Sequence, residues 1–183
     1  MNLTNHFLIS MPQMQDPNFE LTLTYICDHD EHGALGIVVN RTLPISFQEV
    51  LEQTGLDTSM ALTGIPIFEG GPVDPGHGLV LHPETSRDWD ATHHFLSPVC
   101  ISSSRDILAD IAAGDGPDAF LIALGHAGWA PGQLEDEIAG NSWLTCPADL
   151  SVLFGTPPAD KLDAAMRSLG INFTDLSTDT GHA

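Results

Sequence analysis

The chain has 183 residues, of which 42% are hydrophobic and 16% are charged, as expected for a folded domain and not for a disordered chain. Its 25 Asp and Glu against five Lys and Arg give a formal net charge of −20. Phosphate backbones and anionic membranes are bound mainly through Lys and Arg, so this charge argues against direct DNA binding and against membrane-surface binding. The five cationic residues are Arg41, Arg87, Arg105, Lys161 and Arg167.

Short β-rich runs bracketed by turn residues dominate the first two thirds of the chain. The turn-rich segment D-H-D-E-H-G at 28–33 predicts a hairpin between two of these runs. The second strand of this hairpin contains the apolar stretch G-I-V-V, which predicts a central place in a sheet. Strands are expected at 7–10, 21–27, 35–40, 65–68, 79–82, 94–101 and 119–124.

Four helices are expected, each after a start signal. Ser46 and Glu49 have the spacing of a capping box, and the apolar residues of 104–113 recur at helical spacing behind a serine cluster. Pro131 is suited to the first turn of a third helix, and a last helix follows Thr156-Pro157-Pro158 and ends at Gly170. Because strands and helices do not alternate strictly, the sequence predicts a single α+β domain with a mixed sheet.

The compartment is inferred from the cysteines and the apolar runs. Cys27, Cys100 and Cys146 have no C-x-x-C spacing and fit neither a disulfide scaffold nor a structural zinc site. The first twelve residues lack the basic region of a signal peptide, and no run of about 18 apolar residues is present. We therefore expect a cytoplasmic protein without a cofactor and without membrane association.

Four stretches, taken together, resemble the AlgH/YqgE family of bacterial proteins. They are F-L-I-S-M-P-Q-M-Q-D-P-N-F at 7–19, C-D-H-D-E-H-G-A-L-G-I-V-V-N-R at 27–41, E-G-G-P-V at 69–73 with G-L-V-L-H at 78–82, and L-G-H-A-G-W-A-P-G-Q-L-E-D-E-I at 124–138 with N-S-W-L at 141–144. The resemblance covers Leu3 to about Phe173. It implies one domain over 1–174, with a strongly bent mixed sheet that curls into a pseudo-barrel flanked by helices. The residues at 175–183 themselves predict a frayed tail. Members are often described as transcriptional regulators, but the family has no established reaction.

The segment 27–32 has the densest reactive chemistry. In a regular strand Cys27 and His29 would lie on the same face and could pair as thiol and imidazole, although the neighbouring carboxylates would raise the thiol pKa. His29 and His32 with one acid could bind a divalent metal. The alternative is a solvated hairpin turn, and we favour it over both sites.

Two glycine motifs are candidates for ligand binding, because their backbone N–H groups could face an anion. The candidate residues are Gly70, Gly71, Pro72, Gly125, His126, Gly128 and Trp129. His126 stands where the family frequently has a tyrosine, which argues against a family-wide chemical role for it. The favoured alternative is that the glycines allow tight turns and close backbone approach, and that Trp129 and Trp143 wedge the intervening helix against the sheet.

No nucleophile elbow, Walker loop or dinucleotide fingerprint occurs in the sequence. The resemblance and this lack of a catalytic set favour a non-enzymatic regulatory or interaction domain, acting on transcription indirectly through a protein or small-molecule ligand. A small hydrolase or redox enzyme that uses Cys27 or His29 is the alternative, and divalent-metal binding by His29 and His32 is a third possibility.

Overall fold

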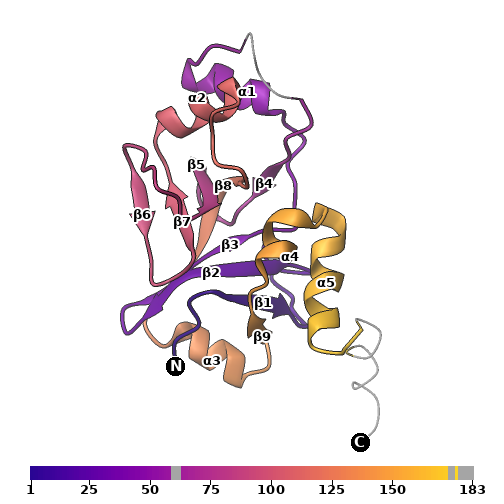
Figure 1. Cartoon of the computed structure of the whole chain (residues 1–183). Helices are drawn as coiled ribbons and strands as arrows, with labels where there is room; N and C mark the ends of the chain where they lie inside the picture. Colours follow the sequence, from indigo (N-terminus) through magenta and orange to yellow (C-terminus); the bar gives the residue numbers. More distant parts are fainter. Residues whose placement is uncertain (59–62, 173–175, 177–183) are drawn as a thin grey trace, which may run out of the picture.

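The computed structural model describes residues 1–58, 63–172 and 176 (Figure 1). The described strands form one nine-stranded sheet in the order β6-β7-β5-β8-β3-β2-β1-β9, and β4 pairs with β8 from the side. Only the β4–β8 pairing is parallel. The strands are β1 His6–Ser10, β2 Leu23–Asp30, β3 Gly33–Val38, β4 Ile67–Glu69, β5 Val73–Pro83, β6 Thr92–His94, β7 Val99–Ser102, β8 Leu121–Trp129 and β9 Trp143–Pro147.

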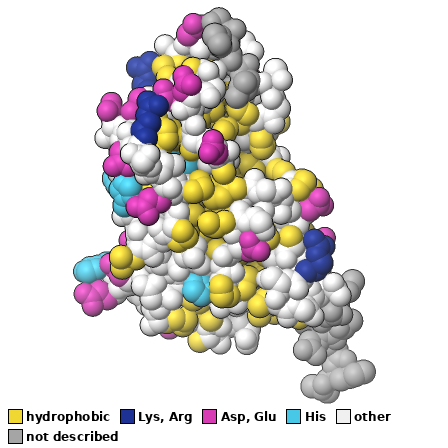
Figure 2. Space-filling model, viewed as in Figure 1, with side chains coloured by type: hydrophobic (Ala, Val, Ile, Leu, Met, Phe, Trp, Pro, Cys, Tyr) yellow, Lys and Arg dark blue, Asp and Glu magenta, His cyan; other side chains and the backbone are white. Residues whose placement is uncertain are grey.

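The helices cover the two ends of this sheet. They are α1 Phe47–Thr54, α2 Arg105–Ala113, α3 Gln133–Ala139, α4 Leu150–Gly155 and α5 Lys161–Ser168, with a short 3₁₀ turn at Pro158–Asp160. In Figure 1, α1 and α2 lie at one end, beyond β4, β5 and β8, while α3, α4 and α5 lie around β1, β2 and β9. Acidic side chains are scattered over the visible face, whereas Lys and Arg are sparse (Figure 2). No helix in the described part of the chain is long and apolar enough to cross a membrane.

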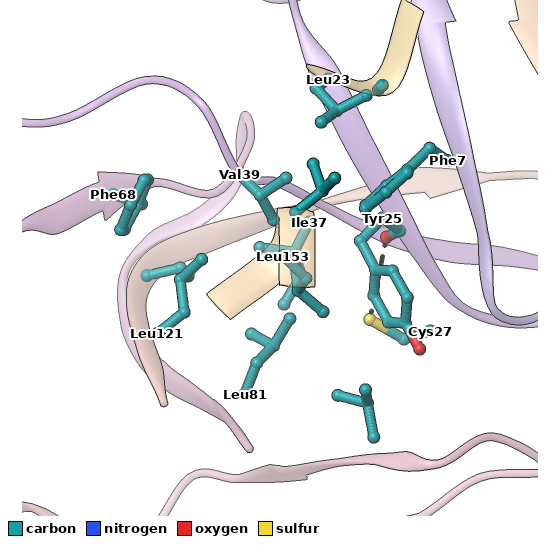
Figure 3. Packing of buried hydrophobic residues seen from close by; sticks show 14 of the residues in the cluster. Phe7, Leu23, Tyr25, Cys27, Ile37, Val39, Phe68, Leu81, Leu121 and Leu153 are labelled. Carbon is teal, nitrogen blue, oxygen red and sulfur yellow. Dashed lines mark hydrogen bonds between the residues drawn. The ribbon is translucent and has the colours of Figure 1, made fainter. Parts of the chain in front are cut away.

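Strand β8 joins the two halves of the sheet. Its first residues pair with β4 and β5, and its last three pair with β3. The curled sheet encloses the main core, in which side chains from β1, β2 and β3 meet those from β5 and β8 and a helix residue, Leu153 (Figure 3). Smaller apolar clusters lie under α1 and α2, and under α3. The α+β class and the curled sheet are as predicted.

Several predicted elements are confirmed in detail. The hairpin forms between β2 and β3, and it turns at residues 31 and 32 because β2 continues to Asp30. Ser46 and Glu49 make the predicted capping box at the start of α1. The third predicted helix is present but begins at Gln133, with Gly132 at a φ of +77° as its cap, so the expected place of Pro131 in its first turn is wrong.

Other elements differ from the prediction. The expected strand at 94–101 is two short antiparallel strands, β6 and β7, since Pro98 lies in the turn and has no N–H to donate to a ladder. Neither β9 nor α4 was predicted, because five and six residues are too few to show a clear period. The expected tail at 175–183 lies, apart from Leu176, outside the described residues.

Candidate functional site

The two glycine motifs lie against each other at the middle of β8. Gly70 donates its N–H to the carbonyl of Leu124 at 2.8 Å. A Cβ on Gly71 would stand 2.3 Å from the carbonyl carbon and oxygen of His126, and one on Gly125 would stand 2.5 Å from the carbonyl oxygen of Gly71. Backbone therefore fills the space between the motifs, which supports close approach as the reason for these glycines.

The hairpin turn reaches the same region from the other side. A Cβ on Gly33 would stand 2.2 Å from the carbonyl oxygen of Trp129, next to the paired residues Ala34 and Trp129 of β3 and β8. The hairpin turn and the two glycine motifs thus converge on the last half of β8. These segments pack backbone against backbone. The two cavities described below are lined by other residues, and the second of them includes residues 76–80 of β5, which follow the first glycine motif.

Cys27 and His29 have separate partners. A β-bulge makes Cys27 an extra residue in β2, because Ile26 pairs with Gly36 and Asp28 with Leu35. Cys27 packs in the main core, and its thiol lies 3.9 Å from the carbonyl oxygen of Tyr25. Burial, reinforced by the charge of Asp28, raises the pKa of this thiol. Thiolate chemistry is disfavoured there.

The His29 imidazole is buried and lies toward α3. Its Nδ1 accepts the N–H of Leu3 at 3.1 Å, so its Nε2 is the donor to Glu135 Oε1 at 3.0 Å. His32 instead lies on the exposed turn, where its N–H donates to Asp30. Within residues 1–58, 63–172 and 176, no group of three His, Cys, Asp or Glu side chains is placed to hold a metal ion.

Trp129 and Trp143 bracket α3 and share one carboxylate. Both indole N–H groups donate to Glu137 Oε2, at 2.9 and 2.8 Å. The two rings are 6.1 Å apart and meet edge to face, and Phe19 contacts both of them. Both tryptophans are buried. This arrangement supports their role as wedges that fix α3 to the sheet.

A cavity of about 210 Å³ lies between β4, the start of β8 and the α4–α5 pair. Three phenylalanines, Phe68, Phe120 and Phe154, contribute to its walls, and Lys161 lines it as well. In Figure 2 hydrophobic side chains gather on the visible face between the α1–α2 end and the α4–α5 pair. The cavity therefore combines apolar walls with one cationic group.

Lys161 is buried, with 3% of its surface exposed. Helix α4 ends at Gly155, so the carbonyl of Leu153 lacks a helical donor, and Lys161 Nζ donates to it at 2.6 Å. Nζ also lies 4.7 Å from the centre of the Phe68 ring. Burial lowers the pKa of Lys161 to about 8. Nothing in the sequence around Lys161 signals that this lysine is buried.

A second cavity of about 210 Å³ lies between α1, β5 and the start of α2. Its lining includes His77 and the exposed Arg105, together with the serines at 102–104. Ser102 is buried, and its hydroxyl lies 2.8 Å from Nε2 of His82. Burial lowers the pKa of His82. The hydroxyls of Thr54, Ser102 and Ser104, which line this cavity, already make hydrogen bonds within the protein.

The β6–β7 hairpin brings together a thiol, an imidazole and a carboxylate that the sequence did not reveal. Cys100 Sγ lies 3.3 Å from His94 Nδ1, and His94 Nε2 lies 3.0 Å from Asp88 Oδ1. This order is that of a nucleophile, a base and an orienting acid. However, Cys100 is buried, and burial together with Glu84 and Asp88 raises its pKa. The triad becomes visible only once 94–101 is known to be a hairpin.

Known proteins resemble the chain over its whole length. A family model described as AlgH-like matches residues 7–174. A UPF0301 protein of Azoarcus sp. (strain BH72) is 47% identical over 183 residues, covering 100% of this chain and 97% of the relative. A UPF0301 protein of Marinomonas sp. (strain MWYL1) is 50% identical over 179 residues, covering 97% of this chain and 95% of the relative.

Solved structures agree with the curled sheet. The solution structure of the AlgH protein from Pseudomonas aeruginosa has a TM-score of 0.83 and 46% identity, covering 100% of this chain and 97% of that one. The crystal structure of protein DIP2367 from Corynebacterium diphtheriae has a TM-score of 0.73 and 19% identity, covering 96% and 92%, and shares the fold. On these matches the chain belongs to the AlgH-like family.

Proposed function

We propose that this chain is a non-enzymatic regulatory or interaction domain that acts through a protein or small ligand and does not contact DNA itself. The observation that carries the proposal is the placement of its few cations. A DNA-binding surface needs several Lys or Arg on one face, free to replace the counterions of the phosphates.

Three of the five cations are engaged within the protein. Arg41 donates to three backbone carbonyls of the segment 17–20, Arg87 pairs with a carboxylate of α2, and Lys161 is buried. The other two, Arg105 and Arg167, are exposed on α2 and α5, which lie at different ends of the molecule (Figure 1). With a net charge of −20, two separated arginines are a poor phosphate-binding surface.

The cavity beside Lys161 favours a small ligand as the means of control. It is about 210 Å³ in volume, and three phenylalanines and one buried ammonium are among its lining residues, a combination of apolar surface and a single polar group that suits a small ligand. An enzyme that uses Cys27 and His29 has less support, because the bulge at Cys27 and the separate partners of the two side chains keep thiol and imidazole apart.

A DNA-binding titration tests the proposal. The purified chain is titrated into mixed-sequence duplex DNA at about 50 mM salt, where even non-specific binders show affinities of about 1 to 100 µM or tighter. We expect no binding in this range. The double variant R105M/R167M, which removes the two exposed arginines that form no ion pair within the described residues, should give the same result. Binding by the wild-type chain that this variant loses would contradict the proposal.

A further inference from the structure

We propose that the cavity beside Lys161 binds a small monocarboxylate with an apolar body, whose carboxylate pairs with the Lys161 ammonium. This inference rests on the proposed function, since it names the chemical class of the small ligand. It draws on the contacts of Lys161, on the cavity walls and on the charge around them.

The Lys161 ammonium has unused capacity for an anion. An ammonium has three donors, and Nζ makes one hydrogen bond, to Leu153, besides lying over the face of Phe68. Among the residues that the structure describes, no carboxylate lies within ion-pair distance of Nζ. Folding has already removed water from this cation, so a carboxylate that reaches it gains an ion pair without further desolvation of the lysine.

The cavity walls select an apolar body. Phe68, Phe120 and Phe154 are joined by Ile65 and Pro66 in the lining. A cavity of about 150 Å³ with similar walls accommodates benzene. At about 210 Å³ this cavity has room for one aromatic or branched aliphatic group and a short carboxylate arm.

The charge selects a single negative group. Lys161 is the one Lys, Arg or His among the described residues that line the cavity. A phosphate monoester would bring a second negative charge without a partner into an acidic protein, whereas a monocarboxylate brings one charge to one ammonium. Nucleotides and sugar phosphates are therefore disfavoured relative to small organic acids.

The first test uses the wild-type chain alone. Phenylacetate and its neutral analogue phenylacetamide are titrated separately at pH 7, with binding followed by calorimetry and by NMR shifts of the phenylalanine rings. We expect phenylacetate to bind about tenfold more tightly or better, because charge-assisted hydrogen bonds are the strong ones. Equal affinities, or no binding of phenylacetate, would overturn the proposal.

The second test removes the ammonium. In K161M an apolar chain of similar length replaces the lysine, so the preference for phenylacetate should disappear. R167M is the matched control, because it removes the same charge from an exposed position of the same helix, and it should keep the preference. A preference that survives in K161M, or that R167M also abolishes, would overturn the site.

The two proposals fail separately. Absence of any carboxylate preference together with absence of DNA binding would overturn the carboxylate site and leave the proposed function standing. A carboxylate preference together with DNA binding by the wild-type chain would support the site and contradict the proposed function.

Discussion

The two halves of β8 have opposite surroundings. Around its last residues, from Gly125 to Trp129, three segments pack backbone against backbone, with no space for a Cβ at Gly33, Gly71 or Gly125. Around its first residues, Leu121 and Ile122, the same strand borders a cavity of about 210 Å³. The most conspicuous sequence motifs therefore lie at the tightest packing, and the space for a ligand lies beside residues of ordinary core type.

The difference teaches what glycine-rich motifs contribute to this fold. A glycine is needed where two backbones approach more closely than any side chain permits, and such places have no room for a ligand. The cavity instead depends on how α4 and α5 pack on the sheet. Its one charged group, the Lys161 ammonium, is buried and donates to the carbonyl of Leu153 near the end of α4.

The largest expected effect on stability is in the last half of β8, where the backbones pack closely against each other. Gly71→Ala would place a methyl group 2.3 Å from backbone atoms of His126, at a φ of +149° that disfavours side chains. We expect a loss of about 4 kcal/mol or more in the free energy of unfolding, because backbone on both sides must move. Urea unfolding followed by circular dichroism measures it.

Gly128→Ala is the matched control for this substitution. Gly128 belongs to the second glycine motif, which packs against that of Gly71, but it is exposed and nothing lies within 4 Å of its added Cβ. Its effect should stay within about 0.5 kcal/mol. If Gly71→Ala were as mild as Gly128→Ala, close backbone approach would not explain the motif.

A smaller loss of stability is expected where α3 is fixed to the last half of β8. In Glu137→Ala the buried indole N–H groups of Trp129 and Trp143 lose their common acceptor. Each buried donor left unsatisfied costs about 1 to 3 kcal/mol, so the variant should lose about 3 kcal/mol. Thermal and urea unfolding both report this.

The control for this loss lies one residue away. Asp136→Ala removes the same charge from an exposed position of α3, and its effect should remain within about 1 kcal/mol. Similar losses in the two variants would mean that charge, and not the shared indole acceptor, stabilises this end of the sheet.

Local patterns in the sequence predicted the elements whose signals are local. The β2–β3 hairpin and the capping box of Ser46 and Glu49 depend on residues close together in the chain. The bulge at Cys27 could not be predicted, because it depends on how β2 pairs with Gly36 and Leu35, and it separates Cys27 from His29.

The cavity beside Lys161 could not be predicted either, because it depends on contacts between residues far apart in the chain. The burial of Lys161 depends on α4, a six-residue helix whose length shows no clear period, and on Phe68 from a distant strand. The pairing of Cys100 with His94 likewise depends on a hairpin, and its Ser97-Pro98 turn lies inside the apolar run that predicts a single strand at 94–101. Both arrangements, the buried Lys161 and the Cys100–His94 pair, depend on long-range packing, which no local sequence pattern indicates.

The last expected effect concerns the first half of β8, beside the cavity, and depends on pH. Burial lowers the pKa of Lys161 from 10.5 to about 8 in the folded chain. Below pH 8 both folded and unfolded chains hold the proton, and the folded chain bears the full cost of the buried charge. Between pH 8 and 10.5 the unfolded chain binds more protons, so stability from this group rises with pH.

The difference between wild type and K161M isolates this contribution, because other titrating groups, including the three cysteines, are common to both chains. The unfolding free energy of wild type relative to K161M should increase by about 3 kcal/mol between pH 7 and 10.5, at about 1.4 kcal/mol per unit of pKa shift. The same comparison with R167M should stay flat, since Arg167 is exposed. If the difference for K161M stayed flat, water or a counter-charge would already stabilise the charged form of Lys161. The cavity beside the first half of β8 would then not hold a cation that lacks a partner, and the proposed difference between the two halves would be contradicted.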